Sequence, residues 1–328
     1  MDTLIKKILV PTDFSKGSEK AYIVAANLAK TFGAKVDFLH VIPTLKYFRE
    51  SVKMMGIPFD MDEDFYPHAQ RDAKHKMEQA AQDYLKEEHR GELHSIIEPR
   101  TAGGIAQFSE KHAHDLVVMG ERGAGETHWL RGSTTERLIR QAKVPVFAVD
   151  DSFQIESIKK ILVPTDGSHY SLQALKMALS LAVTFEATIE LFHVVELYGV
   201  SWENVPRQPD HDEETHARVA ILSHISALVE KDSGFSGVTF TKKSESEPLS
   251  FGFSMNSDTV SVPCELSVAR GVSAHYEIER EAVDKADMVV MATHGHSGLA
   301  HLILGSTAEK VAQYVKKPVL TVRPEGLE

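Results

Sequence analysis

The segment Ile5–Asp13, with the sequence IKKILVPTD, decides the fold because it recurs unchanged as Ile158–Asp166. The two copies start 153 residues apart, and His40-Val41 returns in register as His193-Val194. Solenoid repeats have periods of about 20–50 residues, whereas this spacing has the length of a whole domain. The sequence therefore predicts two homologous domains, residues 1–150 and 157–324, joined by a short polar linker.

The bulk composition narrows the class of protein. With 42% hydrophobic and 25% charged residues, the chain has the composition of a folded globular protein. Its net charge of −11 argues against nucleic acid, and no apolar run approaches the about 20 residues that span a bilayer. Met1-Asp2 precede the first strand without a signal-peptide pattern, and the one cysteine excludes an internal disulfide. We therefore expect a cytoplasmic protein that binds neither nucleic acid nor a membrane.

Both halves alternate apolar strands with helical stripes. Runs such as Ile8–Val10 are apolar on both faces, which is typical of buried parallel strands. Alanines, Leu28 and Phe32 follow at helical spacing, and the second half repeats them. The expected strands are 8–10, 35–41, 93–98, 115–119 and 145–149, then 161–163, 188–195, 264–269, 287–291 and 318–322. This alternation predicts an α/β fold with right-handed crossovers.

The second half carries 19 more residues than the first between its strand-ending histidine and the aspartate before its fourth strand. The surplus falls in Ser233–Ser261, which is rich in serine and glycine. Two interpretations stay open. The first is a hairpin or a flexible surface excursion, and the second is a flap that binds a partner.

Three segments of each half should meet beyond the carboxyl ends of the strands, where open parallel sheets bind ligands. They are Pro-Thr-Asp, His-Val and a glycine loop. The second loop runs from Met291 to Gly295, skips nine residues and resumes at Gly305-Ser306-Thr307. The first runs from Met119 to Gly123 and skips eight residues before Gly132. Glycines let backbone N–H groups approach phosphate oxygens, and a helix N-terminus favours anions.

The pattern Gly-x2-Gly-x9-Gly-Ser/Thr behind a Pro-Thr-Asp strand end resembles the universal stress protein family. The resemblance covers nearly the whole chain twice, as in a tandem member. It implies two Rossmann-like domains of the adenine nucleotide alpha hydrolase-like type, each a five-stranded parallel sheet flanked by helices. Many members bind ATP and others have lost it.

The resemblance also implies which positions hold an adenine nucleotide, ATP or AMP, with Mg²⁺ as an accompanying ion. In the second half these cofactor-binding positions are Pro164, Thr165, Asp166, Val194, Met291, Ala292, His294, Gly295, Gly305, Ser306 and Thr307. In the first half they are Pro11, Thr12, Asp13, Val41, Met119, Gly120, Arg122, Gly123, Gly132, Ser133 and Thr134.

The two halves depart differently from this pattern. The second has Ala292 at the first glycine but keeps the nine-residue spacing. The first is one residue short and places Glu121 and Glu126 where phosphates would lie. A carboxylate there repels a phosphate by about 1–4 kcal/mol per charge pair, which Arg122 and Arg131 could offset. We expect the better ATP site in the second half and a weaker, altered or empty one in the first.

Structural alternatives stand beside these assignments. The glycines could only form a strand-to-helix turn, and Asp13 and Asp166 could only cap the turn that follows them. Ser-x-x-Glu at Ser133 and Ser306 is a capping-box pattern, in which the hydroxyl would bind its own helix instead of phosphate. His40 and His193 end a strand in both halves, which indicates a shared structural role.

The sequence contains no metal or catalytic motif. The histidine pairs 68/75, 211/216 and 294/296 lack the spacing of a metalloprotease site and a cysteine partner, so no metal site is expected. A P-loop and a nucleophile elbow are also absent. We therefore predict no catalytic residues and no enzyme, with slow ATP hydrolysis or nucleotidyl transfer as the less favoured alternative.

Two functions remain at this point. The first is a cytoplasmic stress-response protein that binds ATP or AMP as a regulatory ligand. The second is a nucleotide-independent interaction or scaffold protein. The apolar last strands, 146–149 and 319–322, predict an intrachain pseudo-dimer of the two domains, as exposed apolar edges seek partners, and leave a homodimer and unknown protein partners open.

Overall fold

The computed structural model describes residues 5–44, 50–51, 54–55, 60–121, 132–150, 153–197, 208–232, 235–241, 249–255, 258–295 and 304–326. Internal contacts divide the chain into two compact units, Ile5–Asp151 and Ser152–Glu328. Within the described residues, no helix is both long and apolar enough to cross a membrane.

The first unit contains a parallel sheet with the strand order β3-β2-β1-β4-β5. Its strands are β1 (Lys7–Pro11), β2 (Lys35–Pro43), β3 (Arg90–Glu98), β4 (Leu116–Gly120) and β5 (Val146–Val149). The apolar residues of β1, β4 and β5 are buried on both faces, as their unbroken apolar runs predict. The parallel sheet expected for this half is confirmed.

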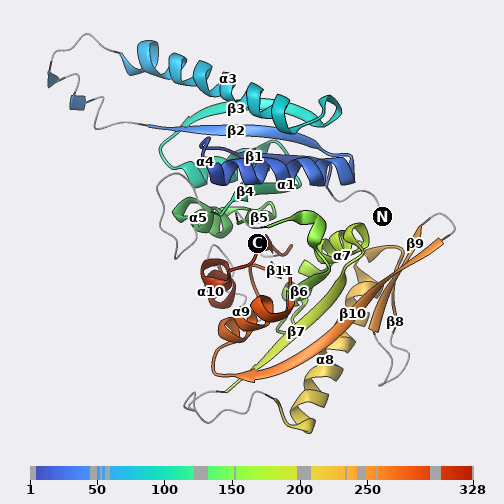
Figure 1. The fold of residues 1–328 in the computed structure, drawn as a ribbon. Coiled ribbons are helices and arrows are strands. Elements are labelled where there is room, and N and C mark those ends of the chain that lie inside the picture. The colour runs from blue at the N-terminus through green and yellow to red at the C-terminus, as the bar shows by residue number, and fades with distance from the viewer. Residues whose placement is uncertain are drawn as a thin grey trace. The chain divides into compact units, whose positions relative to one another are not determined.

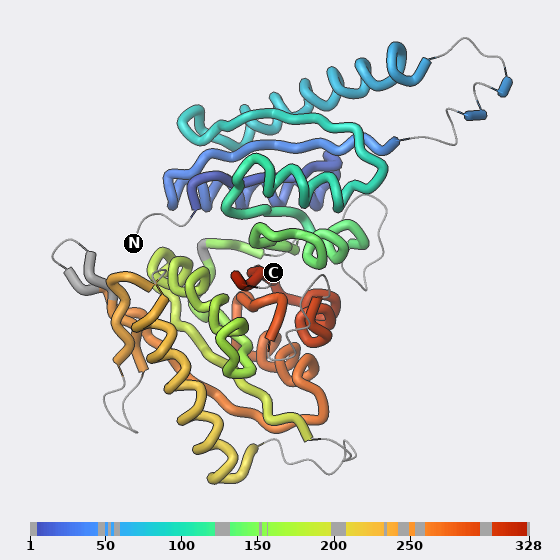
Figure 2. The backbone as a smooth tube through the Cα atoms, turned by 180° about the vertical axis from the view of Figure 1, so that it is seen from behind, coloured from blue at the N-terminus to red at the C-terminus, as the bar shows by residue number. Residues whose placement is uncertain are grey.

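Helices cover both faces of this sheet (Figures 1 and 2). They are α1 (Lys16–Phe32), α3 (Tyr66–Tyr84), α4 (Thr101–Lys111) and α5 (Ser133–Gln141), with the short turns η1 (Met61–Phe65) and η2 (Glu87–His89). Helix α1 packs with α3, and α4 packs with α5 on the other face. Ser15 caps α1, and Gly33 ends it in the left-handed region.

The sheet of the second unit is larger than the sequence predicts. Its order is β12-β11-β6-β7-β10-β9-β8, where β9 and β8 are antiparallel additions. The strands are β6 (Lys160–Pro164), β7 (Thr188–Glu196), β8 (Val238–Thr241), β9 (Leu249–Met255), β10 (Asp258–Gly271), β11 (Met288–Ala292) and β12 (Val319–Val322). The five parallel strands expected for this half are present as β12-β11-β6-β7-β10, and the described part of Ser233–Ser261 extends the sheet beyond them with antiparallel strands. The insertion thus forms the expected hairpin, and its binding of a partner stays a prediction.

The helices of the second unit follow the plan of the first. They are α6 (His169–Leu172), α7 (Ala174–Phe185), α8 (His211–Lys231), α9 (Ala274–Lys285) and α10 (Ser306–Tyr314), with the turn η3 (Ile155–Ser157). Helix α8 begins with a capping box between Asp210 and Glu213, and it packs against β8 and β10 (Figure 1). Helices α9 and α10 pack together.

The duplicated strand is anchored at its amino end by an aspartate that precedes the fourth parallel strand. Asp115 Oδ2 accepts hydrogen bonds from the backbone N–H groups of Lys6 and Lys7, at 2.7 and 2.8 Å. In the second unit, Asp287 Oδ2 accepts from Lys159 and Lys160 at 2.8 and 2.9 Å. These bonds join segments more than 100 residues apart in sequence, so each aspartate fixes the middle one of the five parallel strands of its unit.

Replacing either aspartate should destabilise the protein. Asp115→Ala and Asp287→Ala each leave two backbone N–H groups without their acceptor, which should lower the free energy of unfolding by about 2 kcal/mol. Urea denaturation followed by circular dichroism measures the loss. The exposed Lys30→Ala serves as the control and should change the free energy by less than about 0.5 kcal/mol. Equal values for all three variants would contradict the anchoring role.

Cys264 should be an inert thiol in the folded protein. It lies in β10 with 1% of its surface exposed, and burial raises the pKa of its thiol. Because alkylation requires the thiolate, iodoacetamide should leave the native protein unmodified even at pH 9 and should modify it in urea. Mass spectrometry reads the outcome, and rapid modification of the native protein would show that β10 opens.

Candidate functional site

A cavity of about 560 Å³ lies beyond the carboxyl ends of β6, β7 and β11 in the second unit. This volume is within the about 300–1,000 Å³ typical of small-molecule sites. All eleven positions predicted for this half line it: Pro164, Thr165, Asp166, Val194, Met291, Ala292, His294, Gly295, Gly305, Ser306 and Thr307. Segments separated by more than 140 residues therefore converge on one hollow.

The Pro-Thr-Asp segment is held in place by its own side chains. Thr165 Oγ1 accepts a hydrogen bond from the Gly167 N–H at 3.0 Å and pairs with the Ser171 hydroxyl at 2.8 Å. Asp166 Oδ1 accepts from the Ser168 N–H at 2.9 Å. The predicted turn-capping role of Asp166 is thus confirmed.

His193 has the structural role that its recurrence predicts. Its Nδ1–H donates to the Thr165 carbonyl at 2.9 Å, which ties the end of β7 to the end of β6. His40 does the same in the first unit, where its Nδ1–H donates to the Thr12 carbonyl at 2.8 Å. In both units this bond holds the carboxyl ends of two adjacent strands next to each other at the cavity.

The glycine loop approaches Asp166 closely. A Cβ on Gly295 would lie 2.1 Å from Asp166 Oδ2, so any other residue here would force this carboxylate to move. The Gly305 N–H donates to the Thr293 carbonyl at 2.9 Å and closes the loop before α10. The loop can therefore present backbone groups and the α10 N-terminus to an anion, next to a carboxylate that can accept from hydroxyl groups.

The predicted capping box at this helix is wrong. Gly305, and not Ser306, is the N-cap of α10, and no side chain caps the helix. In the first unit Gly132 takes the N-cap position of α5 in the same way. Each glycine adopts an extended backbone there, which moves the serine one residue into the helix and away from the capping geometry. The expected competition between capping and ligand contact therefore does not arise.

Several lining residues were not predicted. They come from β7 and from the first turns of α6 and α9: Ser171, Phe192, Val195, Glu196, Ala274 and Ile278. Glu196 is held by the Ala274 N–H, which donates to its Oε1 at 2.6 Å. Glu196 follows the predicted position Val194 by two residues on β7 and so lies on the same face, which alternation along the strand could have indicated.

The corresponding cavity of the first unit is smaller, about 330 Å³. Eight of its predicted positions line it: Pro11, Thr12, Asp13, Val41, Met119, Gly120, Gly132 and Thr134. Ser133 is not among the lining residues, and Arg122 and Gly123 lie outside the described residues, as do Glu126 and Arg131.

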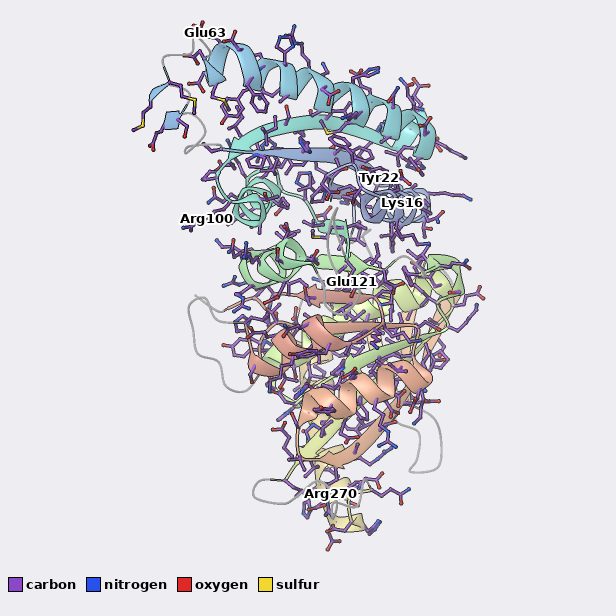
Figure 3. All side chains as sticks on the ribbon, turned by 60° about the vertical axis from the view of Figure 1, so that its left-hand side comes forward. Lys16, Tyr22, Glu63, Arg100, Glu121 and Arg270 are labelled. Atoms are coloured by element: carbon purple, nitrogen blue, oxygen red, sulfur yellow. The ribbon has the colours of Figure 1, made fainter. Side chains whose placement is uncertain are left out.

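Different side chains hold the Pro-Thr-Asp segment of this unit. The Thr12 hydroxyl pairs with the Tyr22 hydroxyl, and Tyr22 lies on α1 (Figure 3). Burial raises the pKa of Tyr22 to about 12, so it remains a neutral phenol. Asp13 Oδ1 accepts from the Ser18 hydroxyl at 2.7 Å and from the Ser15 N–H at 3.0 Å, a capping role like that of Asp166.

Glu121 does not occupy the place expected from the sequence. Its surface is 9% exposed, and it is not among the described residues that line the cavity (Figure 3). Its backbone instead closes the loop, because the Glu121 carbonyl accepts from the Gly132 N–H at 2.8 Å. The expected repulsion between Glu121 and a phosphate in this cavity therefore has no support in the structure.

The first loop glycine is required in one unit only. A Cβ on Gly120 would lie 2.3 Å from the Gly17 carbonyl oxygen, a backbone atom that cannot easily move. Ala292 occupies the same place in the second unit with 6% exposure. The start of α1 thus lies closer to its loop than the start of α6 does.

Exchanging the two residues tests this difference. Gly120→Ala should lower the free energy of unfolding by about 1–3 kcal/mol because of the backbone clash. Ala292→Gly should cost about 1 kcal/mol or less. Urea denaturation of the full chain measures both, and a tolerated alanine at position 120 would show that the start of α1 shifts freely.

Comparison with known proteins places this site in context. The model of the universal stress protein family matches residues 4–150 and 157–323. Universal stress protein MJ0531 of Methanocaldococcus jannaschii is 31% identical over 165 residues, which cover 50% of this chain and 82% of that protein. A universal stress protein of Mycolicibacterium smegmatis is 27% identical over 97% of both chains. The crystal structure of a universal stress protein from Archaeoglobus fulgidus has a TM-score of 0.57 at 19% identity, covering 97% of this chain and 98% of that one.

Proposed function

Because the chain belongs to the universal stress protein family as a tandem member, we propose that it binds ATP or AMP in its second half as a regulatory ligand. The observation that carries the proposal is the convergence of all eleven predicted positions on one cavity of about 560 Å³. In the second half, the glycine loop and the α10 N-terminus offer donors for phosphate, and Asp166 offers acceptors for ribose hydroxyls.

A divalent cation accompanies the nucleotide in this proposal. The described lining of the cavity contains the carboxylates of Asp166 and Glu196 and no lysine or arginine. A triphosphate beside two carboxylates is repelled unless a cation offsets the charge, and Mg²⁺ commonly does so through phosphate oxygens. ATP binding should therefore depend on Mg²⁺, and AMP binding should depend on it less.

The first half acts in this proposal as a weaker or empty site. Support comes from its smaller cavity of about 330 Å³ and from Asp13, one oxygen of which already accepts two hydrogen bonds. The alternative, a nucleotide-independent interaction protein, is favoured by the two carboxylates of the second cavity, whose described lining contains no lysine or arginine. Turnover of ATP, a cytoplasmic location and dimerisation through the last strands stay predictions.

Matched valine variants test the proposal on the full chain. Gly305 and Gly132 have nearly the same backbone, with φ of −57° and −58°, which valine can adopt. A Cβ on Gly305 would lie 3.1 Å from the Thr293 carbonyl oxygen, so the circular dichroism spectrum of each variant is compared with that of the unaltered protein. Gly305→Val should weaken binding of labelled ATP by about tenfold or more, because the side chain covers the backbone N–H groups. Gly132→Val should leave the affinity unchanged. Equilibrium dialysis with and without Mg²⁺ gives both values.

The outcomes separate the candidate functions. One nucleotide per chain, lost in Gly305→Val, supports the assignment. If the unaltered protein takes up no ATP or AMP at millimolar concentration, the interaction protein is the correct function. Loss of binding in Gly132→Val alone would move the site to the first half. Release of phosphate from bound ATP, measured with Mg²⁺, would indicate an ATPase.

A further inference from the structure

A second cluster of polar side chains lies in the first unit near the amino ends of β1, β2 and β3, at the other end of the strands from the cavity. Asp37 on β2 is 1% exposed, and Glu92 and His94 on β3 face it. One ligand atom from each residue lies within 4.8 Å of the other two. These residues belong to neither cavity, and the sequence pairs considered for metals do not include them.

Asp37 is oriented as a metal-binding carboxylate would be. Its Oδ1 accepts from the Glu92 N–H at 2.8 Å, and a Cβ on Gly91 would lie 2.0 Å from this oxygen, so glycine makes room for it. Its Oδ2 faces His94 and lies 3.1 Å from His114 Nε2. Metal-binding carboxylates are commonly fixed by such outer hydrogen bonds.

The imidazole of His94 lacks a hydrogen-bond partner for one nitrogen. Its Nε2 is covered from solvent, and no described residue forms a hydrogen bond with it. Glu92 Oε2 lies 3.1 Å away and Asp37 Oδ2 4.0 Å away, but neither has hydrogen-bond geometry. The ring packs against Phe108 with centroids 4.8 Å apart, which holds its orientation.

The spacing of these atoms suits a transition metal. Bonds of about 2.0–2.2 Å from zinc to nitrogen and oxygen place two ligands of a tetrahedron about 3.3–3.6 Å apart. The distances from His94 Nε2 to Glu92 Oε2 and to Asp37 Oδ2, 3.1 and 4.0 Å, bracket this value. An imidazole with two carboxylates favours Zn²⁺ over Mg²⁺ or Ca²⁺, which prefer oxygen ligands alone. We propose that Asp37, Glu92 and His94 bind one divalent transition-metal ion, with zinc as the best fit.

Lys7 is the competitor for this place. Its Nζ lies 3.1 Å from Asp37 Oδ2 and would be repelled by a bound cation. The Lys7 side chain is 33% exposed, so its ammonium can turn to solvent when the metal enters. Removal of this ammonium should therefore strengthen metal binding. If Lys7 and Asp37 form only a structural ion pair, its removal breaks the pair and leaves zinc binding unchanged.

The second unit provides an internal comparison. Lys160 and Glu190 stand there in place of Lys7 and Asp37, and Glu265 stands in place of Glu92. Lys160 Nζ lies 2.9 Å from Glu190 Oε2. Ser267 stands in place of His94, and its hydroxyl donates to Glu190 Oε1 at 2.6 Å. The repeat keeps the ion pair but has lost the imidazole, so the metal site is expected in the first unit only.

Zinc uptake by the full chain tests the proposal. Dialysis against ZnCl₂ followed by metal analysis should show one more bound zinc in the unaltered protein than in His94→Ser, which copies the second unit. The control His75→Ser removes an exposed histidine on α3 and should keep that zinc. Lys7→Met should tighten binding by about tenfold.

A milder variant covers the case in which His94→Ser does not fold. The Glu92 side chain is 72% exposed, so Glu92→Gln should leave the circular dichroism spectrum unchanged and weaken zinc binding by about tenfold. Zinc should also raise the melting temperature of the unaltered protein more than that of Glu92→Gln at the same zinc concentration. The same zinc content and affinity in the unaltered protein and in every folded variant would overturn the proposal.

Discussion

The middle one of the five parallel strands in each unit, β1 or β6, is held by one side chain at each of its two ends, and the rest of the unit depends on this arrangement. At the amino end an aspartate binds two backbone N–H groups. At the carboxyl end a histidine on the neighbouring strand binds the threonine carbonyl. This strand has β2 or β7 on one side and β4 or β11 on the other. Because the chain leaves it toward opposite sides of the sheet, a crevice opens at its carboxyl end. The duplicated segment therefore fixes the fold and the place of the cavity together.

Much of the cavity could be predicted because its residues follow strand ends. Parallel strands end at one edge, so Pro164–Asp166, Val194 and the glycine loop had to meet whatever the exact helix packing. Repetition helped, since His193 could be compared with His40 and assigned a structural role. Contacts that depend on side-chain direction were harder: Glu121 is buried instead of lining its cavity, and glycines took the N-cap positions expected for serines.

The cluster at the amino edge was invisible in the sequence for a different reason. Asp37, Glu92, His94 and His114 come from three separate segments, and no local spacing links them. The pairing of β2 with β3, which places Leu39 beside His94, brings Asp37, Glu92 and His94 together, and the pairing of β1 with β4 brings His114 to them. The insertion was ambiguous for a related reason, because serine- and glycine-rich segments form strands only when an edge is available to pair with. In both cases the structure depends on strand pairing between distant segments, which local composition does not predict.

Strand β10 changes its partner along its length, and this has an evolutionary consequence. Its residues from Cys264 onward pair in parallel with β7, whereas Asp258 to Cys264 pair with β9 in the antiparallel sense. Only Cys264 takes part in both ladders. The antiparallel strands therefore continue past the amino end of β7 and leave its parallel pairing with β10 intact. Insertions or deletions in these strands would not disturb the strand ends where the cavity lies, so sequence variation there would carry little information about the ligand.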